Sequence, residues 1–266
     1  MMKPVFSLHQ GTNPLLVSVP HAGTHIPNEM RSLFTPKALE VHDTDWHLDQ
    51  LYDYVKAQNA SLLVPLHSRY VIDLNRPPDG AAMYPGANNT GLCPVTDFDG
   101  ESVYLADRTP DAQQITQRIA QYWRPYHDAI ASELARIKAL HGYAVLFDGH
   151  SIKSQVPWLF EGQLPDLNIG TANGASCAVN LREAVAQLLA GQSDFTHVTD
   201  GRFKGGYITR QYGRPAQGIH AVQLEMCWST YMHESPPYVI DPQRHVRIHP
   251  VLKDLTALLA SVVPHD

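Results

Sequence analysis

The stretch "LLVSVPHAGTHIP", residues 15–27, joins a short apolar run to two histidines. The run Leu15–Val19 predicts a buried strand, because it is short, apolar and followed at once by turn-forming residues. Pro20 cannot continue a ladder of strand hydrogen bonds, and a glycine and a second proline follow it. We therefore expect His21 and His25 on a rigid loop at the end of a strand, a place where proteins often carry functional residues.

Further runs of this kind alternate with helical patterns. Strands are predicted at Ser61–Pro65, Tyr70–Leu74, Tyr143–Phe147, Phe195–Thr199 and Ile219–Met226. Helices are predicted around Leu48–Val55, from an N-cap at Thr109 to an end at Gly142 with a kink at Pro125, at Ala178–Ala190 and at Val251–Val263. This alternation indicates an α/β fold. No linker or repeat divides the chain, so we expect residues 1–266 to form one domain.

Composition narrows the class of protein. Of the 266 residues, 44% are hydrophobic and 17% are charged, which is typical of a globular protein. The net charge of -6 argues against a general nucleic-acid binder, which needs a basic face. No stretch approaches the roughly 20 apolar residues that span a bilayer, and the N-terminal segment lacks the apolar run of a signal peptide. We therefore expect a cytoplasmic protein that binds neither nucleic acid nor membrane.

Chemically active residues are predicted at three strand ends. Besides the loop with His21, the segment "FDGHS" places Asp148 and His150 just past an apolar strand, and "VQLEM" places Glu225 in another. Ligands of open α/β sheets gather beyond the carboxyl ends of the strands, so these residues are expected to converge. Two histidines and a carboxylate form a typical catalytic zinc set, with a fourth position left for water.

The third ligand is predicted in "VHDTDWHLD", residues 41–49, before a helix. Asp45 is our choice, because it can reach the metal from the loop, and Asp43 is the alternative. A single histidine is more often a satisfied polar residue than a ligand, so the metal hypothesis depends on the set. Iron, cobalt and manganese also accept such ligands.

Glu225 interrupts an otherwise apolar strand. A buried charge is costly unless it is paired or functional, so an ion pair with an arginine is the structural alternative. Beside a metal-bound water, Glu225 could accept a proton and pass it to a leaving group. Ser18, Ser151 and Cys227 lie in no nucleophile motif, so water is the expected nucleophile.

An anion site is predicted at "SRYVIDLNRPPDG", residues 68–80. Asn75 and Arg76 precede a stiff double proline, and the planar guanidinium of arginine suits carboxylates. Arg69 and Arg210 are further candidates for substrate binding, whereas Arg214 is expected in a surface ion pair. Residues 77–110 are rich in Pro, Gly, Asn and Asp, which predicts a long ordered loop over the site.

Six segments together resemble the N-formylglutamate amidohydrolases: "VSVPHAGTHIP", "DTDWHLDQLYD", "SRYVIDLNRP", "FDGHS", "GGYITRQYGRP" and "VQLEM". The resemblance covers nearly the whole chain. It implies a zinc-dependent hydrolase that converts N-formyl-L-glutamate and water to L-glutamate and formate, the last step of a histidine-degradation route. It also implies a three-layer α/β/α fold with a mixed central sheet, similar to zinc carboxypeptidases.

Residue by residue, the resemblance makes His21 and His150 the metal histidines, Glu225 the catalytic carboxylate, and Asn75 and Arg76 the substrate-carboxylate pair. One position departs from the carboxypeptidase-like pattern, since Thr24 stands where that pattern has a glutamate ligand. Asp45 is transferred as the third ligand in its place. The alternatives are an amidohydrolase for another N-acyl amino acid, similar to aspartoacylases or succinylglutamate desuccinylases, and a non-catalytic protein that binds acidic amino acids.

Overall fold

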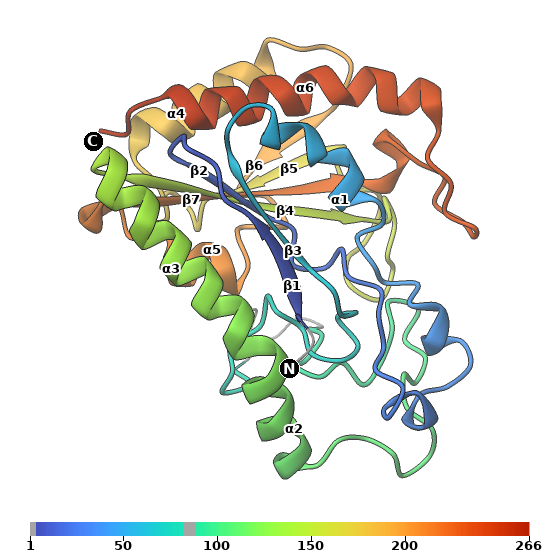
Figure 1. The fold of residues 1–266 in the computed structure, drawn as a ribbon. Coiled ribbons are helices and arrows are strands. Elements are labelled where there is room, and N and C mark those ends of the chain that lie inside the picture. Colours follow the sequence, from blue (N-terminus) through green and yellow to red (C-terminus); the bar gives the residue numbers. More distant parts are fainter. Residues whose placement is uncertain (1–3, 82–88, 266) are drawn as a thin grey trace.

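A mixed sheet of seven strands runs through the centre of the protein, in the order β1-β3-β2-β4-β7-β5-β6 (Figure 1). The computed structural model describes residues 4–81 and 89–265. The strands are β1 Phe6–His9, β2 Leu15–Ser18, β3 Ser61–Pro65, β4 Ala144–Ile152, β5 Leu167–Gly170, β6 His197–Thr199 and β7 Ile219–Cys227. Strands β3, β2, β4 and β7 are parallel, whereas β1 and β5 run antiparallel to β3 and β7.

Helices cover both faces of this sheet (Figure 1). They are α1 Leu48–Leu51, α2 Ala112–Arg118, α3 Arg124–His141, α4 Val179–Ala190, α5 Tyr207–Tyr212 and α6 Pro242–Ser261. Helices α1, α4 and α6 pack on one face, and α3 and α5 pack on the other. None of the helices in the described ranges is long and apolar enough to cross a bilayer.

Successive residues of the central strands face opposite helical layers. In β4, Val145 and Phe147 join the core under α4 and α6, while Ala144 and Leu146 join the core under α3. A strand with both faces buried reads as a continuous apolar run, which is why β2, β4 and β7 could be recognised in the sequence. On the α3 face, the same alternation continues toward the carboxyl end of β4 with polar residues instead of apolar ones.

Most predicted elements are present, with shifted ends. The predicted helix start at Thr109 is wrong by a few residues, because Asp111 caps α2 and forms a reciprocal capping box with Gln114. A π-helical turn at Ile119–Trp123 joins α2 to α3 just before Pro125, where a kink was expected. Gly142 ends α3 with a φ of 82°, as a left-handed C-cap.

The prediction of a strand at Tyr70–Leu74 is wrong. This segment is buried but forms turns, and its backbone groups bond to side chains and to loop backbone rather than to a neighbouring strand. Arg118 Nη1 donates to the carbonyl of Val71 at 3.0 Å, and the amide of Asp73 donates to the carbonyl of Leu92 at 2.7 Å. Strands β1 and β5 were not predicted, because they are short and contain polar residues.

Candidate functional site

The carboxyl ends of β4 and β7 carry four polar side chains on the face that α3 and α5 cover. In the parallel register, His150 lies beside Glu225 and Asp148 beside Gln223. The sequence placed Asp148 and His150 just past the strand, and this is wrong, because β4 continues to Ile152. The strand itself therefore fixes where both side chains point.

Two loops bring the remaining polar groups to this edge. His21 follows β2, and its carbonyl accepts the amide of Asp45 at 3.0 Å. The amide of Ser151, in β4, donates to Asp45 Oδ2 at 3.0 Å. Asp45 is thus held by backbone groups from both the His21 loop and β4.

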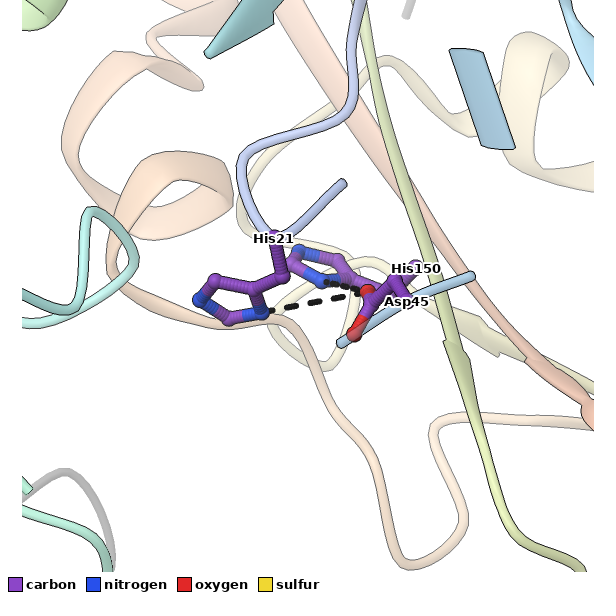
Figure 2. A group of neighbouring side chains, drawn as sticks. All are labelled: His21, Asp45 and His150. Atoms are coloured by element: carbon purple, nitrogen blue, oxygen red, sulfur yellow. Dashed lines mark hydrogen bonds and ion pairs between the residues drawn. The ribbon is translucent and has the colours of Figure 1, made fainter. Parts of the chain in front are cut away.

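His21, Asp45 and His150 form a buried group with the spacing of metal ligands (Figure 2). Asp45 Oδ2 lies 3.1 Å from His150 Nδ1 and 3.8 Å from His21 Nδ1, and one ligand atom from each residue fits within 4.8 Å. Asp43, the alternative third ligand, lies outside this group. Its Oδ2 accepts the amide of Phe98 at 3.0 Å.

A carboxylate lies behind the imidazole of His21. His21 Nε2 is 2.7 Å from Asp73 Oδ1, and Arg69 Nη2 donates to Asp73 Oδ2 at 2.6 Å. Burial, with a further contribution from Arg69, lowers the pKa of His21 below 6.5. Burial alone would raise the pKa of Asp73, but His21 and Arg69 outweigh it and hold the pKa well below 3.8. A neutral His21 that donates from Nε2 keeps the Nδ1 lone pair for a metal.

His150 is held in a similar way. Its Nε2 lies 3.2 Å from Asp148 Oδ1 and 2.8 Å from Asn75 Nδ2. Burial lowers the pKa of His150, but Asp148 and Asp45 outweigh it, so the pKa is raised well above 6.5. This imidazole therefore lies in a strongly negative environment.

The buried charges of the site fit a bound cation. Four buried carboxylates lie here, from Asp45, Asp73, Asp148 and Glu225, together with the buried guanidinium of Arg69. Metal ligands must be deprotonated, and a divalent ion would balance the negative charge that otherwise holds a proton on His150. Two imidazoles and a carboxylate, with carboxylates behind the imidazoles, match a zinc site in donor type.

Glu225 faces the same cavity as the His21–Asp45–His150 group. Its exposed fraction is 8%, and burial raises its pKa to about 8, although His150 opposes this shift. Catalytic groups that accept and return protons are often carboxylates of this kind, with a raised pKa at the edge of a cavity.

Arginines from different segments approach this cavity. Arg69, Arg76 and Arg202 line it, whereas Arg210 is exposed and does not. Arg210 Nε instead donates to the carbonyl of Gly205 at 2.8 Å. Thr90 holds Arg76 through its carbonyl and its hydroxyl, both at 2.8 Å.

Asn75, a predicted substrate contact, lines the cavity and is also part of the polar network. Its Oδ1 accepts the amide of Ile208 at 2.8 Å, and its Nδ2 faces His150. Gly206 packs so closely that a Cβ on it would lie 2.3 Å from Asn75 Nδ2. Asn75 is therefore held between the loop before α5 on one side and His150 on the other.

Comparison with known proteins agrees with this geometry. Residues 13–232 match the model of a protein family described as N-formylglutamate amidohydrolase. The chain belongs to this family. The predicted resemblance is therefore confirmed.

Two relatives of this N-formylglutamate amidohydrolase family member are named N-formylglutamate deformylase. The protein of Pseudomonas putida is 46% identical over 260 residues, which cover 97% of each chain. That of Pseudomonas aeruginosa is 47% identical over 237 residues, which cover 89% of each chain.

Solved structures support the predicted α/β fold with a mixed central sheet between helices. The crystal structure of an N-formylglutamate amidohydrolase from Ralstonia eutropha superposes with a TM-score of 0.82 and 26% identity, over 97% of both chains. A gene product from Agrobacterium tumefaciens shares the fold alone, with a TM-score of 0.73 and 18% identity over 96% of this chain and 95% of that one.

Residues that sequence reasoning missed complete the site of this family member. Asp73 lies in the quoted segment "VIDLNR", where a carboxylate within an apolar run was the available signal. Arg202 and Phe98 line the cavity from loops that carry no recognisable motif. The loop at residues 77–110 was expected to cover the site, and Asn89, Thr90 and Phe98 do line the cavity, whereas residues 82–88 lie outside the described part of the chain.

Proposed function

We propose that this protein is an N-formylglutamate deformylase, which hydrolyses N-formyl-L-glutamate to L-glutamate and formate. The observation that carries the proposal is the buried His21–Asp45–His150 group, which shares a cavity with Glu225 in a chain of this family. Two relatives with the same name, at 46% and 47% identity, support the substrate. Residues 1–266 would act as one catalytic domain.

We propose zinc as the metal, held by His21, Asp45 and His150. When bound, the ion supplies a Lewis acid and lowers the pKa of a water molecule. Asp73 keeps the proton of His21 on Nε2, which would leave Nδ1 available as a ligand, and Asp148 contacts His150 Nε2.

Glu225 is the proton carrier in this proposal. Its carboxylate accepts a proton from the attacking water and delivers it to the nitrogen of glutamate as the C–N bond breaks. Arg69 lies beside His21 and Asp73, and its guanidinium stabilises negative charge that develops on the formyl oxygen.

The substrate carries two carboxylates, which call for cationic partners. Arg76 is aimed by Thr90 and is the first partner. Arg202 lines the same cavity and is the second, in place of Arg210, which is exposed outside it. A guanidinium can hold a carboxylate through two charge-assisted hydrogen bonds. In this proposal Asn75 acts through His150 rather than on the substrate.

Formate release tests the proposal directly. The purified protein is assayed with N-formyl-L-glutamate as isolated, after chelation, and after zinc is added back. Activity that is lost on chelation and restored by zinc supports the reaction and its metal dependence. A folded protein that releases no formate under any metal condition contradicts it, and turnover of acetyl- or succinyl-glutamate in the same assay would identify a different amidohydrolase.

A further inference from the structure

Apolar side chains form one wall of the cavity, next to the metal-ligand group. Phe98 and Ile152 line the cavity and belong to an apolar cluster that also contains Val156, Leu164 and Cys227. Ile152 follows His150 by two residues in β4, so both side chains leave the same face of the strand. Phe98 and Ile152 therefore place apolar surface beside the reacting centre.

Short contacts connect Phe98 to that centre. The guanidinium carbon of Arg69 lies 5.0 Å from the centroid of the Phe98 ring. The same arginine contacts Asp73, which contacts His21. The amide of Phe98 donates to Asp43 at 3.0 Å, two residues before the ligand Asp45. The ring is thus held at the metal side of the cavity.

The turn that carries Phe98 is tied down at several points. The amide of Asp97 donates to the carbonyl of Glu101 at 2.9 Å, and the amide of Gly100 donates to the carbonyl of Asp97 at 3.0 Å. Lys37 Nζ lies 2.9 Å from carboxylate oxygens of both Asp97 and Asp99. These contacts fix the backbone position from which the Phe98 ring enters the cavity.

The Phe98 ring lies next to the place that the reacting carbonyl takes in the proposed function, because Arg69, which contacts the ring, stabilises the formyl oxygen there. In an N-acyl amino acid, the acyl substituent and the nitrogen of the amino-acid part are both bonded to the reacting carbonyl carbon, at an angle to each other, so they occupy different parts of the cavity. Of the two arginines that hold the amino-acid part in the proposed function, Arg76 is fixed by Thr90, and Arg202 donates to the carbonyl of Leu159 at 3.1 Å. A formyl group presents only a hydrogen toward Phe98, whereas an acetyl group presents a methyl.

We propose that Phe98 sets the size limit for the acyl group, so that formyl is accepted and acetyl and larger groups are excluded. This inference rests on the proposed deformylase function. An added methyl group in a packed wall forces side chains or backbone to shift. Discrimination by one carbon in an apolar pocket is typically about 10-fold to 200-fold in kcat/KM.

Kinetics with matched substrates test this role. We compare kcat/KM for N-formyl-L-glutamate and N-acetyl-L-glutamate in the wild type, in Phe98→Ala and in Phe98→Leu. The acetyl-to-formyl ratio is expected to rise about tenfold or more in Phe98→Ala, and less in Phe98→Leu. Phe160→Ala is the control, because Phe160 packs against the same apolar cluster but does not line the cavity, and its ratio should stay at the wild-type value.

The outcomes separate this inference from the proposed function. An unchanged ratio in a folded, metal-loaded variant that still releases formate overturns the role of Phe98, and Phe98→Leu supplies that answer if the alanine variant does not fold. An equal rise in Phe160→Ala also overturns it, because the effect would then come from general loosening of the cluster. A wild type that hydrolyses neither substrate overturns the deformylase function itself.

Discussion

Each histidine of the metal-ligand group is oriented by a carboxylate on its far side. Asp73 contacts His21 at 2.7 Å, and Asp148 lies 3.2 Å from His150. Such a contact orients the imidazole and, where the ring is neutral, as for His21, fixes which nitrogen carries the proton. The affinity of the site for a metal should therefore depend on residues that never touch the ion.

We expect Asp73→Asn to weaken zinc binding about 10-fold to 100-fold. The amide cannot accept the proton of His21 Nε2 as a charged group does, and it leaves Arg69 without its closest counter-charge. Competition with a chromophoric chelator measures the zinc affinity. Asp200→Asn is the control, since Asp200 pairs with Arg182 away from the site, and it should lower stability without changing zinc affinity.

We expect Glu225→Gln to lower kcat about 100-fold to 10,000-fold, because the amide cannot accept a proton from water. Zinc content should stay close to that of the wild type, since Glu225 is not in the His21–Asp45–His150 group. Steady-state kinetics together with metal analysis of the same sample check both statements. Near-normal turnover in a folded, zinc-loaded variant would contradict the role of Glu225.

The sequence predicted the residues that strand ends carry, and it missed those that tertiary packing supplies. His21, His150 and Glu225 could be found because polar residues interrupt or follow apolar strands. Asp73 was missed because its contact with His21 depends on a buried turn that resembled a strand. Arg202 enters the cavity from a loop whose path depends on packing between distant segments, which no local pattern records.

Secondary structure elements could be predicted where the local sequence pattern alone indicates a buried strand or a helix end. Strands β3 and β7 coincide with largely apolar runs, and α3 ends where Gly142 allows a left-handed conformation. The segment Tyr70–Leu74 has the same apolar character but forms turns. Its backbone partners, such as Arg118 and Leu92, lie far along the chain. Local propensity cannot show whether a buried backbone bonds to a neighbouring strand or to side chains and loops.

The loop before α5 gives an element-scale prediction. We expect Gly206→Ala to lower kcat/KM for N-formyl-L-glutamate at least tenfold, because the new Cβ would lie 2.3 Å from Asn75 Nδ2 and displace it from His150. Kinetics and a melting curve check this. Gly191→Ala is the matched control, since a Cβ there meets no atom closer than 3.5 Å, and its kinetics should match the wild type. Equal kinetics for both variants would show that Asn75 tolerates displacement.

At the scale of the whole molecule, the parallel order of β3, β2, β4 and β7 makes the site possible. The candidate metal ligands come from residues 21, 45 and 150, and they meet because parallel strands end at one edge of the sheet. The helices on either face bury both sides of these strands, so stability also depends on groups that do not line the cavity. One such group is His127, on α3.

His127 is buried between the helical layer and the sheet. Its Nε2 lies 2.8 Å from the carbonyl of Leu74, its Nδ1 lies 2.9 Å from the hydroxyl of Tyr212, and its ring stacks on Trp123 at 3.7 Å between centroids. Burial lowers its pKa from 6.5 to about 4. The folded protein therefore keeps His127 neutral at pH values where the unfolded chain takes up a proton.

We expect His127 to make the free energy of unfolding fall as the pH falls from about 6.5 to 4. In this window the unfolded state binds a proton that the folded state does not bind, so the free energy of unfolding falls by up to about 1.4 kcal/mol per pH unit and by about 3 kcal/mol in total. This loss disappears above pH 7.

His127→Gln keeps a donor for the carbonyl of Leu74 but does not titrate, so its free energy of unfolding should fall less steeply. Urea unfolding of both proteins between pH 4.5 and 7.5 measures the two slopes, and other histidines, including His67, cancel in their difference. His265→Gln, at an exposed position, should follow the wild type. Parallel curves for the wild type and His127→Gln would contradict the lowered pKa of His127, because they would mean that His127 accepts its proton within the folded protein.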